Sequence, residues 1–145
     1  MTGAFRLDPR IEASTLAFGR SALCSLRIMN DRRFPWLVLI PERPDLREIH
    51  DLEPGLRTEL TEEIAAVSRA LQAATGAEKI NIGTLGNIVP QLHVHVIGRF
   101  QDDPAWPGPV WGFYAAVPYE RTEADDFASR VRTCLDASFL AQKRT

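Results

Sequence analysis

The sequence predicts an α+β fold, in which a mainly antiparallel sheet is grouped around one long central helix and a second helix lies near the C-terminus. Three observations predict it. Short apolar segments rich in β-forming residues are separated by turn-forming residues, at 22–30, 36–41, 79–83 and 91–97. A long amphipathic stretch lies between the second and the third of these. The β-α-β alternation that would build a parallel sheet is not seen.

The length of 145 residues is typical of one domain, so we expect a single domain over residues 1–145. The formal charge of −2 and the pI near 5.9 give no basic field, so long nucleic acids are not expected partners. The N-terminal MTGAFRLDPR lacks a secretory apolar stretch, and the run FPWLVLIP is too short to span a bilayer. A cytoplasmic protein without a membrane partner is therefore expected.

The first elements follow from caps and apolar runs. Asp8-Pro9 can open a short helical turn, with Asp as the cap and Pro at the first helical position. ALCSLRIMN at 22–30 and WLVLIP at 36–41 form a predicted hairpin. Cys24 and Cys134 are far apart in sequence in apolar surroundings, which favours free thiols.

Two helices are predicted from apolar periodicity. The first begins at Pro54 and ends at Gly76, and its apolar residues recur at helical spacing: Leu56, Leu60, Ile64, Val67 and Leu71. The second starts at Thr122, which can cap it with Asp125 three residues on. Its apolar stripe is Phe127, Val131, Leu135 and Phe139.

Between these helices, KINIG at 79–83 and QLHVHVI at 91–97 are predicted strands, joined by the turn-rich TLGNIVP. The aromatic and proline-rich segment that follows, QDDPAWPGPVWGFYAAVPYE, is predicted to be an ordered loop packed on the body of the protein.

The segment QLHVHVI carries two of the three histidines. Side chains alternate across a strand, so Gln91, His93 and His95 are expected on one face, opposite three apolar residues. From Ile80 to Gly98 there is no charged residue. A polar row without neighbouring carboxylates can meet an anion without repelling it.

Imidazole suits phosphoryl chemistry, because its pKa near 6.5 leaves a neutral nucleophile at neutral pH. If a carbonyl holds the proton of one nitrogen of His93, the other nitrogen can attack phosphorus. Two alternatives stay open. The pair can be a satisfied polar face, or it can supply two metal ligands, with a third from His50 or a carboxylate that no nearby spacing supplies convincingly.

QLHVHVI resembles the signature of the histidine triad (HIT) family, in which three histidines alternate with apolar residues, with Gln91 in the first triad position. The resemblance covers roughly residues 20 to 115, including RIMNDRRFPWLVLIPERPDLREIHDL and INIGTLGNIVP. It implies a HIT-like fold and a nucleotide hydrolase or transferase that acts on the α-phosphate of nucleoside monophosphate conjugates. It also implies a homodimer that needs no metal or other cofactor.

The resemblance also implies roles for individual residues. His93 corresponds to the nucleophile that forms a nucleotidyl-histidine, and His95 to the histidine close to the phosphate. Asn30 corresponds to a ribose-binding position, and Asn81 and Asn87 to polar positions near the phosphate. Asn30 and Asn87 are equally compatible with turns.

Gln91 is the main departure from the family pattern. Glutamine donates and accepts hydrogen bonds but does not titrate, so we expect a supporting role at the first triad position. The alternative is a nucleotide-binding or sensory module with weak catalysis.

Four other residues or pairs are candidates for a place in the site. Trp36 is interpreted as a bulky core residue, and His50 as a surface or capping residue. Arg99 can steer phosphate, although a solvated strand end is the expected role. The loop with Trp106 and Trp111 either approaches the substrate or the dimer partner, or anchors itself on the body.

Overall fold

The computed structural model describes residues 3–141. Its five strands form one sheet in the order β1-β2-β3-β5-β4, and every neighbouring pair is antiparallel. The strands are β1 (Thr15–Arg20), β2 (Cys24–Met29), β3 (Trp36–Pro41), β4 (Lys79–Gly83) and β5 (Val94–Arg99). The predicted α+β fold with an antiparallel sheet is confirmed.

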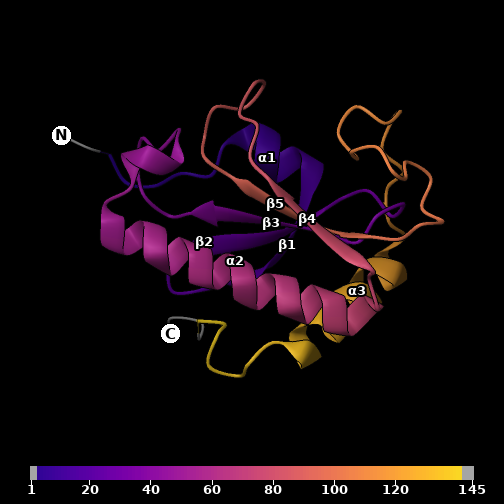
Figure 1. Cartoon of the computed structure of the whole chain (residues 1–145). Helices are drawn as coiled ribbons and strands as arrows, with labels where there is room; N and C mark the ends of the chain where they lie inside the picture. Colours follow the sequence, from indigo (N-terminus) through magenta and orange to yellow (C-terminus); the bar gives the residue numbers. More distant parts are fainter. Residues whose placement is uncertain (1–2, 142–145) are drawn as a thin grey trace.

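Helix α2 (Pro54–Thr75) runs along one face of the sheet, with α3 (Arg121–Cys134) beside it (Figure 1). α2 ends where predicted, because Gly76 adopts the left-handed conformation with φ of 73°. The short α1 (Pro9–Ser14) begins as predicted: the Asp8 side chain accepts a hydrogen bond from the Arg10 amide. A 3-10 turn, η1 (Ile49–Asp51), lies in the connection before α2.

The sheet is covered on both faces. On the α2 face, Leu92, Val94 and Val96 join a large apolar core with residues of α2 and α3. The opposite face carries a second core, in which Trp36, Val38 and Ile97 pack under α1 and the loop after β5. Coverage on both sides explains why every residue of β3 and β5 is buried.

Some elements differ from the sequence prediction. Strand β1 was not predicted; its burial pattern lacks strict alternation because a bulge lies between Ala17 and Gly19. β5 begins at Val94, so the 91–93 segment precedes the ladder. α3 is capped by Glu120 and Glu123 rather than by Thr122 and Asp125.

α3 also ends sooner than predicted, at Cys134, so Phe139 lies beyond it. Both cysteines are free thiols, as predicted, with Cys24 buried and Cys134 exposed. Within residues 3–141, none of the helices combines the length and the apolar character needed to cross a bilayer.

Arg99 orders the loop after β5. The sequence suggested a solvated strand end or a residue that steers phosphate, and the structure corrects both roles. Its side chain is 1% exposed and forms an ion pair with Asp103, with Nε 2.8 Å from Oδ2. Nη2 also donates to the carbonyl of Gly108 at 2.8 Å. Arg99 is therefore neither solvated nor free to meet a phosphate, and it ties β5 to its loop.

Candidate active site

His93 lies one residue before β5, and its imidazole contacts the main chain two residues earlier. Nδ1 lies 2.6 Å from the carbonyl oxygen of Gln91. A carbonyl oxygen only accepts hydrogen bonds, so Nδ1 carries the proton. In the neutral ring, Nε2 then has a free lone pair, as a nucleophile requires.

His95 lies in β5 on the face opposite α2. Its Nδ1 accepts a hydrogen bond from the indole Nε1 of Trp36 at 2.9 Å. The two imidazole ring centroids are 4.9 Å apart. Burial, with a smaller contribution from His93, lowers the pKa of His95 to about 3. His95 is therefore neutral at physiological pH.

Both histidines line a cavity of about 470 Å³, large enough for a small ligand. The rest of its wall comes from three places: Arg10 and Ser14, residues 85–89 before the triad segment, and Trp111. The 85–89 segment includes Asn87, the only one of the three predicted asparagines to line this cavity. The wall is mostly apolar.

Arg10 is the one arginine or lysine among the described residues that line this cavity. Its Nη1 donates to the carbonyl of Ile88 at 3.0 Å, which joins α1 to the 85–89 segment. Its Nη2 pairs with the carboxylate of Asp8 at 2.9 Å. Hydrogen bonds from Arg10 hold the pKa of Asp8 below its usual value, so the carboxylate stays charged beside its partner.

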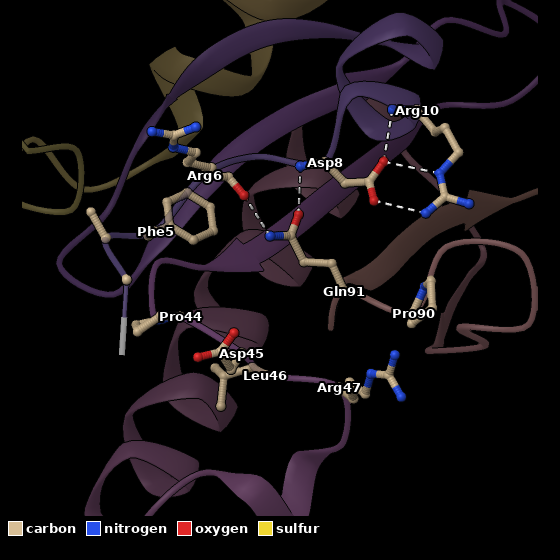
Figure 2. Close-up of a pocket in the computed structure, with 12 residues that line it drawn as sticks. Phe5, Arg6, Asp8, Arg10, Pro44, Asp45, Leu46, Arg47, Pro90 and Gln91 are labelled. Atoms are coloured by element: carbon tan, nitrogen blue, oxygen red, sulfur yellow. Dashed lines mark hydrogen bonds and ion pairs between the residues drawn. The ribbon is translucent and has the colours of Figure 1, made fainter. Parts of the chain in front are cut away.

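Gln91 does not extend the polar row of His93 and His95. Its side-chain oxygen accepts from the Asp8 amide and its nitrogen donates to the Arg6 carbonyl, both at 2.8 Å (Figure 2). It lines a different cavity, of about 440 Å³, formed with the N-terminal segment and residues 44–47. The strand face predicted for Gln91 was wrong because the ladder begins only at Val94. What supports His93 is the main-chain carbonyl of Gln91.

Asn30 and Asn81 lie outside the histidine cavity, and their side-chain oxygens are used within the protein. Oδ1 of Asn30 accepts from the Tyr119 amide at 2.9 Å, which joins the end of β2 to the segment before α3. Oδ1 of Asn81 accepts from Nη1 of Arg99 at 2.8 Å. Both side-chain oxygens therefore make structural contacts, and the substrate contacts expected for Asn30 and Asn81 stay a prediction.

Of the two loop tryptophans, only Trp111 reaches the site. Its ring packs edge-on against His95, with centroids 5.5 Å apart. It fits because β4 has glycine at position 83, where a Cβ would lie 2.8 Å from Cη2 of Trp111. Trp106 instead covers the guanidinium of Arg99. His50 is an exposed residue of η1, as expected.

Sequence reasoning missed three contributors to the site: Arg10, Ser14 and the donor role of Trp36. Trp36 fills the core as predicted, since it is 6% exposed. Its contact with His95 follows from the ladder, in which Trp36 pairs with Ile97 and Val38 with His95. To predict this contact, one must know that β3 pairs with β5. The hydrophobic pattern within one strand does not contain that information.

The metal alternative lacks its third ligand. Across residues 3–141, no group of three or more His, Cys, Asp or Glu side chains is placed to hold a metal ion. His50, the ligand considered from the sequence, does not line the cavity.

Comparison with known proteins agrees with the fold and the histidine motif. The HIT domain matches residues 10–102, which include all five strands of the sheet, all of α2 and the triad segment. The chain therefore belongs to the histidine triad (HIT) family. Members of this family are generally nucleotide hydrolases or transferases.

Solved structures of bacterial histidine triad proteins are similar over nearly the whole chain. One from Sinorhizobium meliloti is 53% identical, with a TM-score of 0.89, and the match covers 90% of this chain and 97% of that one. One from Bradyrhizobium japonicum is 42% identical with a TM-score of 0.89, covering 92% and 99%. One from Marinobacter aquaeolei is 41% identical with a TM-score of 0.89, covering 92% and 97%. Among curated proteins, none shows significant similarity.

Proposed function

We propose that the protein hydrolyses or transfers the nucleoside monophosphate group of a small conjugate, through a nucleotidyl-histidine at His93. One observation carries this proposal: Nδ1 of His93 donates to the Gln91 carbonyl at 2.6 Å, so in the neutral ring Nε2 has the free lone pair, and His93 lines a 470 Å³ cavity. Membership of the HIT family supports the same class of chemistry.

In the first step, the Nε2 lone pair attacks the α-phosphorus and the bond from phosphorus to the leaving group breaks. The leaving group departs with the bonding electron pair and takes a proton from water. The phosphorylated ring is cationic, and the Gln91 carbonyl stabilises that charge through Nδ1–H. Water, or the hydroxyl group of another acceptor in a transferase, then attacks phosphorus and gives up its proton to the hydroxide left by the first step. The P–N bond breaks and Nε2 recovers its lone pair.

A second candidate is a nucleotide-binding or sensory module that turns over slowly. The observation in its favour is Gln91, since a side chain that does not titrate and turns toward Arg6 and Asp8 supplies no acid or base to the phosphate. In this case a nucleotide would raise the melting temperature without being consumed.

The decisive experiment mixes the protein with an adenosine phosphoramidate, quenches the reaction within seconds and searches by mass spectrometry for adenylate on His93. We expect the adduct in the wild type and none in His93→Ala. Gln91→His should form it at a similar rate, because the main-chain carbonyl at position 91 is kept.

Intact substrate and an unmodified wild-type protein would reject the enzyme, and thermal protection by AMP in the same samples would then favour the sensor. An adduct that survives in His93→Ala would place the nucleophile elsewhere.

A further inference from the structure

A hydrogen bond between two buried side chains joins β3 to the second histidine of the motif. Trp36 and His95 lie on the same face of the sheet, because their ladder partners, Ile97 and Val38, both belong to the core opposite α2. Nε1 of Trp36 is 2.9 Å from Nδ1 of His95. The two residues are only 6% and 4% exposed, so water hardly competes for this bond.

The chemistry of the donor determines the state of the acceptor. An indole nitrogen carries a hydrogen and only donates, so Nδ1 of His95 must be unprotonated. The neutral ring then carries its proton on Nε2. An imidazolium would place a second N–H against the indole N–H and would lose its hydration, so the cation is disfavoured here.

We propose that Trp36 is a positioning residue, which holds His95 as the neutral Nε2–H tautomer so that this ring offers one N–H donor to a phosphate oxygen in the cavity. The inference rests on the function proposed above for the phosphate partner. His95 keeps its Nε2 proton throughout the reaction. It donates a hydrogen bond to the phosphate but acts neither as a general base nor as a general acid. Its contribution is a fixed dipole beside the phosphorus that His93 attacks.

The two tryptophans that flank His95 provide a matched comparison. Each ring meets the imidazole edge-on with centroids 5.5 Å apart. The Trp36 indole donates to His95, whereas Nε1 of Trp111 is buried without a hydrogen-bond partner among residues 3–141. Replacing either tryptophan with Phe removes an indole that contacts the His95 imidazole. Only the replacement of Trp36 also removes a hydrogen bond.

The test is nitrogen NMR of the three histidine rings in the uniformly labelled protein, since correlations to the ring carbon protons distinguish a bare nitrogen from a protonated one. In the wild type, we expect bare Nδ1 and protonated Nε2 at His95, unchanged between about pH 8 and pH 5. Trp36→Phe should populate both tautomers, and Trp111→Phe should keep the wild-type pattern. Adding AMP should shift the Nε2 signal.

Turnover provides the second readout. Trp36→Phe should lower kcat about 10- to 100-fold, as is typical when a supporting partner of a functional histidine is lost, with little change in KM. Protonated Nδ1 in the wild type overturns the inference even if Trp36→Phe fails to fold. An unchanged pattern in folded Trp36→Phe also overturns it. The expected tautomer and AMP shift without any turnover would support the positioning role and reject the enzyme.

Discussion

His95 is enclosed by aromatic rings, so its protonation is coupled to folding. Its neighbours are Trp36, Trp111 and the imidazole of His93. Burial lowers the pKa of His95 to about 3, below the value near 6.5 of an unfolded histidine. Between these values the unfolded chain binds a proton that the native protein does not bind. The contribution of His95 to stability is therefore complete above about pH 6.5 and decreases as the pH falls toward 3.

We predict that lowering the pH from 7 to 5 reduces the free energy of unfolding by about 2 kcal/mol through this residue alone. Urea denaturation at the two pH values measures it. The control is His95→Gln, which does not titrate and should show a smaller decrease. Equal decreases in the two proteins would contradict the prediction.

Gln91 supports the N-terminal segment through both groups of its side-chain amide (Figure 2). Gln91→Ala removes both hydrogen bonds and should make the local opening of residues 6–8 easier by about 1 to 2 kcal/mol, since each bond contributes about 1 kcal/mol net. Hydrogen exchange of the Asp8 amide measures this opening.

The control is Gln91→Glu, which keeps the acceptor for Asp8 and loses the donor to Arg6. We expect it to give an intermediate exchange rate. Exchange at Asp8 that is the same in Gln91→Ala and in the wild type would show that the amide does not hold the segment.

At the scale of elements, patterns within a segment predicted most of the sheet. β2 and α2 have apolar residues at regular spacing, and β3 is a continuous apolar run bounded by prolines. The positions of all three agree with the prediction. β1 was missed because the bulge beside Gly19 breaks its alternation. In the site, alternation linked His93 to His95, but the Trp36 contact required the pairing of strands distant in sequence.

The ion pair of Arg99 and Asp103 joins β5 to the loop that carries Trp111. Their side chains are only 1% and 6% exposed. Arg99→Met would leave the Asp103 carboxylate buried without its partner, so we predict a loss of about 3 to 5 kcal/mol in the free energy of unfolding. Chemical denaturation measures the loss.

A second i,i+4 pair, Arg130 with Asp126 on α3, is the control, because its side chains are 53% and 71% exposed. Asp126→Asn should cost no more than about 1 kcal/mol. Similar losses for the two variants would indicate that burial does not determine the strength of the Arg99 pair.

For the whole molecule, the homodimer implied by the family resemblance stays a prediction, and the sheet offers a surface for it. β4 is an edge strand, and its Ile82 is 53% exposed. Leu85 and Ile88, in the segment that follows, are 51% and 82% exposed. An unpaired edge with exposed apolar side chains favours association with another chain.

We predict that Ile82→Lys makes the protein monomeric, as light scattering would show by a halved mass. Ile49→Lys is the control, because Ile49 is 44% exposed but lies in η1, away from this edge. A monomeric wild type, or a mass unchanged by Ile82→Lys, would reject dimerisation through β4.

The bond that orients His93 comes from a peptide group, and every amino acid has one. The side chain at position 91 was therefore available for another task, and here it holds a segment 83 residues earlier in the chain. Position 91 can therefore hold the His93 ring through its main chain and residues 6–8 through its side chain without conflict. A triad that lacks its first histidine can thus keep its second histidine oriented.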